Sequence, residues 1–106
     1  MHLLEIKLLL LESALIFELI GDSYLEEKNY QLAIDFYDQA LDLDPDKYSI
    51  YQYRAYAYEA LEDYFTALLD MNEAIKQNPD YGYLYFKRGE YSFKLGNNDN
   101  ACSPRT

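Results

Sequence analysis

Apolar and small residues recur three and four positions apart along most of the chain, which is the spacing of one helical face. The first such set consists of Phe17, Ile20, Gly21 and Tyr24. The next set consists of Tyr30, Ala33, Ile34, Tyr37, Ala40 and Leu41. Pro45 then ends the pattern, because proline disfavours a helical conformation in the residue before it.

The same spacing continues to about residue 95, so the pattern predicts a chain made of helices. We expect a leading helix near 3–13, either separate from or continuous with a helix that ends at about residue 27, and then helices near 30–43, 48–61, 64–77 and 82–95. The last eleven residues are rich in Asn, which competes with the backbone for hydrogen bonds, and we expect them to form a loop.

The pattern itself returns after 34 residues. Equivalent positions are held by Phe17, Tyr51 and Tyr85, by Gly21, Ala55 and Gly89, by Asn29, Asp63 and Asn97, and by Ala33, Ala67 and Ala101. Each 34-residue unit therefore contains two helices joined by a short turn. Glycine and alanine in the repeated columns allow the two helices of a unit to approach closely, while the aromatic residues fill the space beside them.

These columns resemble the tetratricopeptide repeat, whose signature is an aromatic residue, a small residue four positions later, then Tyr, Ala, an aromatic residue, Ala and a closing Pro. Residues 14–47 and 48–81 match this signature throughout, and residues 82–101 match its first half. The third unit departs from it at Ser92 and Asn98, and the second has Met71 where the first has Tyr37.

The resemblance implies an all-α fold, a right-handed solenoid of helical hairpins with about five or six helices. It also implies an order of units along the chain. We expect an apolar N-terminal helix at 1–13, two full repeats at 14–47 and 48–81, a partial third repeat at 82–101 and a disordered tail at 102–106.

Composition narrows the possible partners. The chain has 106 residues, enough for one domain, and a formal net charge of −10, which repels nucleic acid and anionic lipid surfaces. The first eleven residues are apolar, but Glu5, Lys7 and Glu12 interrupt them, so a membrane span is not expected and an interfacial or cleaved segment is the alternative. We therefore expect a cytoplasmic protein without nucleic-acid or membrane partners.

The inventory of reactive residues argues against catalysis and metal binding. His2 is the only histidine and Cys102 the only cysteine, and both lie in terminal segments. The acidic run 42–46 has the spacing that opens a calcium loop, but Lys47 stands where that loop needs glycine and Tyr53 where it needs glutamate. We expect no enzyme, no cofactor and no metal, and an enzyme is the most distant alternative.

The first helix of each unit lines the inner groove of such a solenoid, so the helical period selects the candidate binding residues. In the first unit they are Glu18, Asp22 and Leu25. In the second they are Gln52, Tyr53, Tyr56 and Glu59, and in the third Tyr83, Phe86, Lys87, Glu90 and Phe93. The sequence therefore predicts a non-catalytic module that binds a peptide or partner protein in an acidic, tyrosine-rich groove, with a preference for basic ligands.

Co-chaperone members of this family hold a C-terminal Glu-Glu-Val-Asp tail in a two-carboxylate clamp of Lys, Asn and Arg. The matching positions here are Glu18, Asp22, Tyr53, Tyr83 and Lys87. Only Lys87 has the charge that the clamp requires. We therefore expect the clamp to be absent.

Self-association is the alternative function. The segment 82–95 carries more apolar surface than one neighbouring hairpin can bury, and a second copy, the rest of a longer protein or a ligand could cover it. The candidate self-association residues are Tyr83, Phe86, Tyr91 and Phe93. Residues 1–47 have a net charge of −8, whereas within 82–95 Lys87, Arg88 and Lys94 outnumber Glu90, so opposite ends of two copies are complementary and a homodimer is expected.

Overall fold

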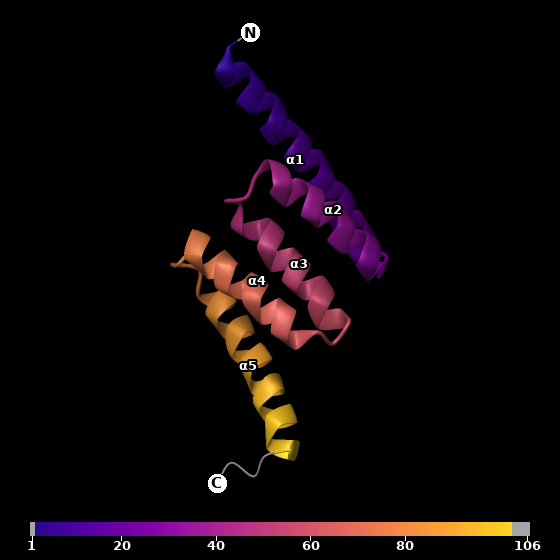
Figure 1. Ribbon diagram of the computed structural model, residues 1–106, viewed down its shortest axis with the longest axis vertical. Coiled ribbons are helices and arrows are strands. Elements are labelled where there is room, and N and C mark those ends of the chain that lie inside the picture. The colour runs from indigo at the N-terminus through magenta and orange to yellow at the C-terminus, as the bar shows by residue number, and fades with distance from the viewer. Residues whose placement is uncertain (1, 103–106) are drawn as a thin grey trace.

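The computed structural model describes the backbone of residues 2–102 and the side chains of residues 2–96 (Figure 1). This part of the chain forms five α-helices and no strand: α1 (Leu3–Glu26), α2 (Tyr30–Leu43), α3 (Tyr48–Ala60), α4 (Tyr64–Gln77) and α5 (Gly82–Cys102). The helices stack in sequence order into an elongated body measuring 63 × 29 × 19 Å. The all-α solenoid expected from the repeat is confirmed.

Small side chains let the two helices of each hairpin approach closely, as the repeated columns predicted. Ala33 and Ala40 of α2 and Ala67 and Ala74 of α4 are completely buried. Ile50 of α3 belongs to the same buried cluster as Ala33 and Ala40, so the core is continuous from the first hairpin to the second. Apolar burial between neighbouring helices thus holds the stack together.

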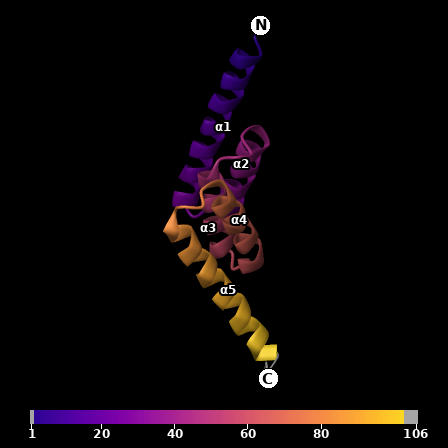
Figure 2. The ribbon, with the colours of Figure 1, turned by 90° about the vertical axis from the view of Figure 1, so that its left-hand side faces the viewer.

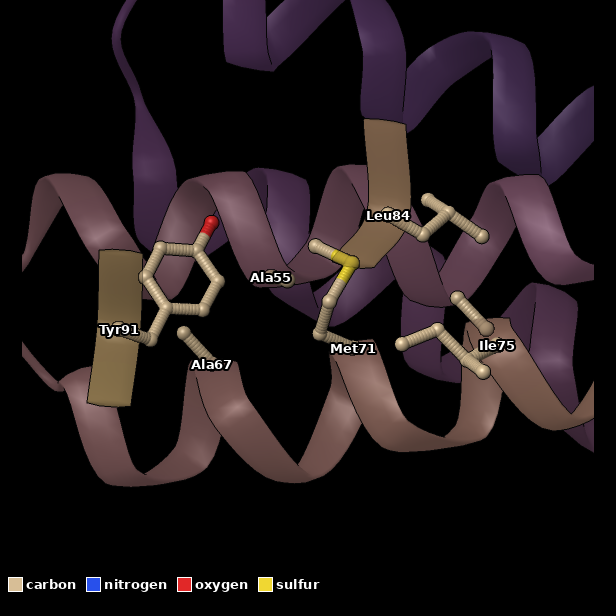
Figure 3. Packing of buried hydrophobic residues seen from close by; sticks show 7 residues of the cluster. Ala55, Ala67, Met71, Ile75, Leu84 and Tyr91 are labelled. Atoms are coloured by element: carbon tan, nitrogen blue, oxygen red, sulfur yellow. The ribbon is translucent and has the colours of Figure 1, made fainter. Parts of the chain in front are cut away.

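The second core cluster joins α3, α4 and α5 (Figure 3). Met71 and Ile75 of α4 lie close to Leu84 of α5, while Ala67 lies beside the ring of Tyr91. Leu84 and Tyr91 are seven residues apart, so they share one face of α5 and both point into this cluster.

The turns α1–α2 and α3–α4 have the same geometry. Lys28 and Glu62, 34 residues apart, both adopt a left-handed backbone with φ of 63° and 64°. The next residue caps the following helix in each case: Asn29 Oδ1 accepts from the Leu32 amide at 3.5 Å, and Asp63 Oδ1 accepts from the Thr66 amide at 3.2 Å. Sequence periodicity therefore extends to the backbone of the turns.

The N-terminal part of α1 projects from the stack, and so does the C-terminal part of α5 at the opposite end (Figures 1 and 2). All side chains of residues 2–12 are exposed, including a run of leucines. None of the described helices is both long enough and apolar enough to cross a membrane.

The expectation for the C-terminal end of the described chain needs correction. A loop was expected from residue 96, but α5 continues as helix to Cys102. Within the described residues no second helix packs on α5 as α2 packs on α1, so nothing bends the backbone into a turn. Its polar groups are instead paired by continuing the helix. Residues 103–106, most of the expected tail, lie outside the described residues.

Candidate functional site

The helices α1, α3 and α5 lie along one side of the stack, with α2 and α4 on the other (Figure 2). We call the surface of α1, α3 and α5 the first-helix face. A pocket of about 490 Å³ opens on it between α1 and α3. Its lining residues are Leu19, Asp22, Ser23, Leu25, Glu26 and Tyr53. Three of them, Asp22, Leu25 and Tyr53, belong to the groove expected from the sequence.

Sequence reasoning missed the other three lining residues, although the helical period held the signal. Glu26 is one helical turn after Asp22, and Leu19 is one turn before it. Ser23 follows Asp22 directly. A predicted binding face one residue wider on α1 would have included all three residues.

Glu18 lies on the first-helix face, but it is buried and paired within the chain. Its Oε1 is 2.7 Å from Lys47 Nζ, and its Oε2 accepts a hydrogen bond from Ser49 Oγ at 2.8 Å. A carboxylate that leaves water needs partners of this kind to remain charged. The Glu18 charge is therefore largely neutralised by Lys47.

Asp22 is half-buried and bonded to the core. Tyr37 of α2 donates its hydroxyl proton to Asp22 Oδ1 at 2.5 Å. Burial raises the pKa of Asp22 above its ordinary value, the bond from Tyr37 lowers it, and the nearby Glu18 charge raises it, with a net upward shift. Burial, followed by the bond to Asp22, also raises the pKa of Tyr37, so its hydroxyl stays protonated and remains a donor at neutral pH.

The tyrosines of α3 form a connected group. The rings of Tyr53 and Tyr56 meet edge to face, with centroids 5.2 Å apart. Gln52, which is buried, donates through Nε2 to the Tyr56 hydroxyl at 2.7 Å. Burial raises the pKa of Tyr56 to about 12. Tyr53 is more exposed and presents its ring to the pocket.

Lys87 of α5 is buried in a cage formed with α3. Its Nζ lies 2.8 Å from Glu90 Oε1 and 3.3 Å from Glu59 Oε1. The same Nζ is 5.5 Å from the ring centroids of both Tyr56 and Tyr91, which is within the range of cation–π attraction. Lys87 is therefore already occupied by partners from its own chain.

Tyr91 was expected on the self-association surface, and the structure corrects this. The residue is 1 % exposed, and its hydroxyl donates to Glu59 Oε1 at 2.7 Å. The apolar pattern of α5 failed to separate its two faces, because Tyr91 shares the face of Leu84 rather than that of Tyr83, Phe86 and Phe93. Those three rings are exposed, and the Tyr83 and Phe86 centroids are 5.9 Å apart.

In the part of the chain that the structure describes, no group of three or more His, Cys, Asp or Glu side chains is arranged to hold an ion. The arrangement offers carboxylates, exposed rings and a pocket open to solvent.

Solved structures share this architecture. The first tetratricopeptide domain of Spaghetti (RPAP3), bound to the HSP90 peptide SRMEEVD, is similar with a TM-score of 0.78 and 28% identity, covering 91% of this chain and 83% of that one. The second such domain of the same protein, bound to the same peptide, has a TM-score of 0.82 and 25% identity, covering 92% and 89%.

The exclusion of chaperone C-terminal tails drawn from the sequence is wrong. Two of the similar structures hold the HSP90 peptide SRMEEVD, which ends in Glu-Glu-Val-Asp. The exclusion relied on the formal charges of matching positions. At one of those positions the formal charge misleads, since the Glu18 carboxylate is paired with Lys47 and is largely neutralised.

Sequence relatives agree with the structures. The protein STIP1 homolog of Dictyostelium discoideum is 32% identical over 81 residues, covering 76% of this chain, and human serine/threonine-protein phosphatase 5 is 36% identical over 76 residues, covering 72%. The chain spans only 14% and 15% of these relatives. Two models described as tetratricopeptide repeat match residues 14–47 and 36–68. The chain belongs to the tetratricopeptide repeat family.

Proposed function

We propose that this chain is a non-catalytic protein-interaction module that binds an extended peptide along the first-helix face. The observation that carries the proposal is the pocket between α1 and α3, lined by Asp22, Glu26 and the exposed ring of Tyr53. Exposed rings continue from there onto α5 at Tyr83, Phe86 and Phe93. A row of rings and carboxylates on rigid helices suits a peptide that lies extended across them.

The C-terminal peptide of HSP90 is the first ligand to test. Domains 25% and 28% identical to this chain hold SRMEEVD. On the first-helix face Lys47 and Lys87 are each paired with glutamate. A peptide carboxylate therefore reaches either of these two cations by replacing a glutamate, and the acidic character of the face then limits the affinity.

The experiment is a titration of fluorescently labelled SRMEEVD with the purified chain, followed by anisotropy. We expect saturable binding that weakens at least about fivefold in Tyr53→Ala and in Phe86→Ala, because each removes an exposed ring from the face. Phe65→Ala is the matched control. Phe65 lies on α4 and is 59% exposed, the same as Phe86. Absence of saturable binding, or an equal loss in Phe65→Ala, would contradict the proposal.

Self-association is a second candidate, favoured by the exposure of the apolar rings of α5. Phe86 and Phe93 point away from the core, and no described helix covers them. Sedimentation of the parent chain would show a dimer, and Phe86→Glu with Phe93→Glu would give a monomer, since burying carboxylates in an apolar contact is costly. A parent that stays monomeric at high micromolar concentration removes this candidate.

A further inference from the structure

We propose that the pocket between α1 and α3 is a subsite for the side chain of an arginine in the bound peptide. This inference rests on the proposed function and specifies the chemistry of one position of the ligand. The proposal combines three features of the pocket: an excess of unpaired carboxylate charge, an exposed ring at its wall, and apolar surface beside both.

The carboxylates of the pocket have no cation of their own. Among the described residues, neither Asp22 nor Glu26 forms an ion pair. Tyr37 occupies only Oδ1 of Asp22, which leaves Oδ2 without a donor in the described chain. Lys47, whose charge acts on Asp22, is already held by Glu18 at 2.7 Å.

Four other carboxylates of the described chain are each paired with a cation. Glu59 and Glu90 share Lys87, which is also on the first-helix face. Asp38 and Asp70 share Arg54 on the other side of α3. The carboxylates at Asp22 and Glu26 are thus the acidic pair beside a pocket that the described chain leaves without a cation.

The charged groups around Asp22 make the electrostatic potential at the pocket negative. Glu18 and Glu26 on α1 raise the pKa of Asp22, while Lys47 before α3 lowers it, and burial contributes most to the net rise. Tyr37 from α2 faces Asp22 as a neutral donor, and Tyr53 from α3 faces it as a neutral ring. Three carboxylates therefore face one ammonium group, and a ligand cation would relieve the excess.

The shape and lining of the pocket fit arginine better than a small cation. Leu19 and Leu25 offer apolar surface to the methylene stem of a long side chain. The planar guanidinium can lie on the ring of Tyr53 while its separate N–H groups reach Asp22 and Glu26. Lysine offers one compact ammonium group and no plane for stacking, so it is the weaker ligand.

The test uses the peptide that a similar domain holds, because SRMEEVD contains one arginine. We compare it with SQMEEVD and SKMEEVD by anisotropy on the full chain. The arginine peptide should bind about five- to tenfold more tightly than the glutamine peptide, with the lysine peptide between them. The preference should shrink as ionic strength rises, since Glu26 is exposed to solvent.

Variants of the pocket locate the effect. In Asp22→Asn with Glu26→Gln the three peptides should bind equally, whereas Glu12→Gln, which removes an exposed carboxylate from the projecting part of α1, should keep the arginine preference. Equal binding of SRMEEVD and SQMEEVD to the parent chain would overturn the subsite and leave peptide binding intact. Failure of all three peptides to bind would instead count against the proposed function.

A second measurement tests the subsite without any peptide. Acetyl-arginine amide is titrated into labelled protein and followed by two-dimensional NMR, with acetyl-norleucine amide as the uncharged control. Arginine should produce saturable shifts confined to amides of residues 19–26 and 53, and norleucine should produce none there. Shifts that are absent or spread over the surface would overturn the subsite whatever the peptides do.

Discussion

The ring of Tyr37 lies directly against Gly21, so that a Cβ placed on residue 21 would be 2.7 Å from Tyr37 Cε1 and 2.8 Å from Cδ1. The equivalent position of the second unit is Ala55, which packs in one cluster with Met71. Gly89 holds the equivalent position in the third unit, and beyond its own stretch of helix no atom lies within 4 Å of its ideal Cβ. The same column of the repeat thus meets a tyrosine ring in the first unit, a packed cluster in the second and open space in the third.

This contrast predicts opposite effects of the same substitution. Gly21→Ala should lower the free energy of unfolding by about 1–3 kcal/mol, because the ring of Tyr37 must move in a packed core. Gly89→Ala should raise it by about 0.5–1 kcal/mol, because alanine is the better helix former and meets open space. Urea denaturation of both variants measures the difference. Equal effects at the two positions would show that the columns are not packed as described.

Much of the fold was predictable because it depends on period and residue size. The spacing of three and four placed α2 at residues 30–43 and α4 at residues 64–77, and both helices have those bounds. Repeated alanines predicted close helix crossings, and they are buried. Packing of this kind is local and periodic, so it leaves a regular signal in the sequence.

The site was harder to predict because it depends on contacts between residues far apart in the chain. Tyr91 and Phe93 look equally apolar in the sequence, yet Tyr91 is buried with its hydroxyl bonded to Glu59 of α3, whereas Phe93 is 67% exposed. Lys47 neutralises Glu18 across 29 positions. Neither pairing follows from helical spacing, and the Lys47–Glu18 pair reduces the negative charge that a ligand meets.

Arg54 provides a second stability test. Its Nε and Nη2 donate to the two oxygens of Asp70 at 2.8 and 2.7 Å, and its Nη1 donates to Asp38 at 2.7 Å. The Asp70 side chain is 6% exposed and that of Asp38 is 52% exposed. Arg54→Met should therefore lower the free energy of unfolding by about 3 kcal/mol, because it leaves the Asp70 carboxylate buried without its partner.

Asp38→Ala is the matched variant, since it removes the exposed arm of the same network. Asp38→Ala should lower the free energy of unfolding by less than about 1 kcal/mol, because exposed ion pairs contribute little to stability. Thermal or urea unfolding compares the two. A loss in Asp38→Ala as large as that in Arg54→Met would mean that the exposed contact carries the network.

The left-handed turns predict a gain in stability. Lys28 and Glu62 have positive φ, a conformation that a side chain disfavours and glycine tolerates. Lys28→Gly and Glu62→Gly should each raise the free energy of unfolding by about 0.5–1 kcal/mol, and the two gains should add because the turns are separate. Glu12→Gly, in the exposed part of α1, is the control and should be destabilising, since glycine weakens a regular helix. A loss of stability at either turn would contradict the assigned backbone.

The raised pKa of Asp22 predicts how its replacement depends on pH. Because burial raises the folded-state pKa above the ordinary 3.8, the folded protein binds this proton more tightly than the unfolded chain does. The free energy of unfolding contributed by Asp22 therefore falls as pH rises from below 3.8 through the raised value. Asp22→Asn removes that ionisation and keeps an oxygen that can accept from Tyr37.

Asp22→Asn should accordingly be more stable than the parent at pH 7, and the advantage should disappear near pH 3.5, where the parent carboxyl is protonated as well. Urea unfolding of both proteins at the two pH values gives the difference directly. Asp22→Ala separates charge from bonding, because it removes the charge together with the acceptor that satisfies the Tyr37 hydroxyl and should lose stability relative to Asp22→Asn at both pH values. If the advantage of Asp22→Asn instead grew toward acid pH, the folded protein would be stabilising the charged carboxylate. Asp22 would then not be the desolvated group that the packing of α1 against α2 indicates.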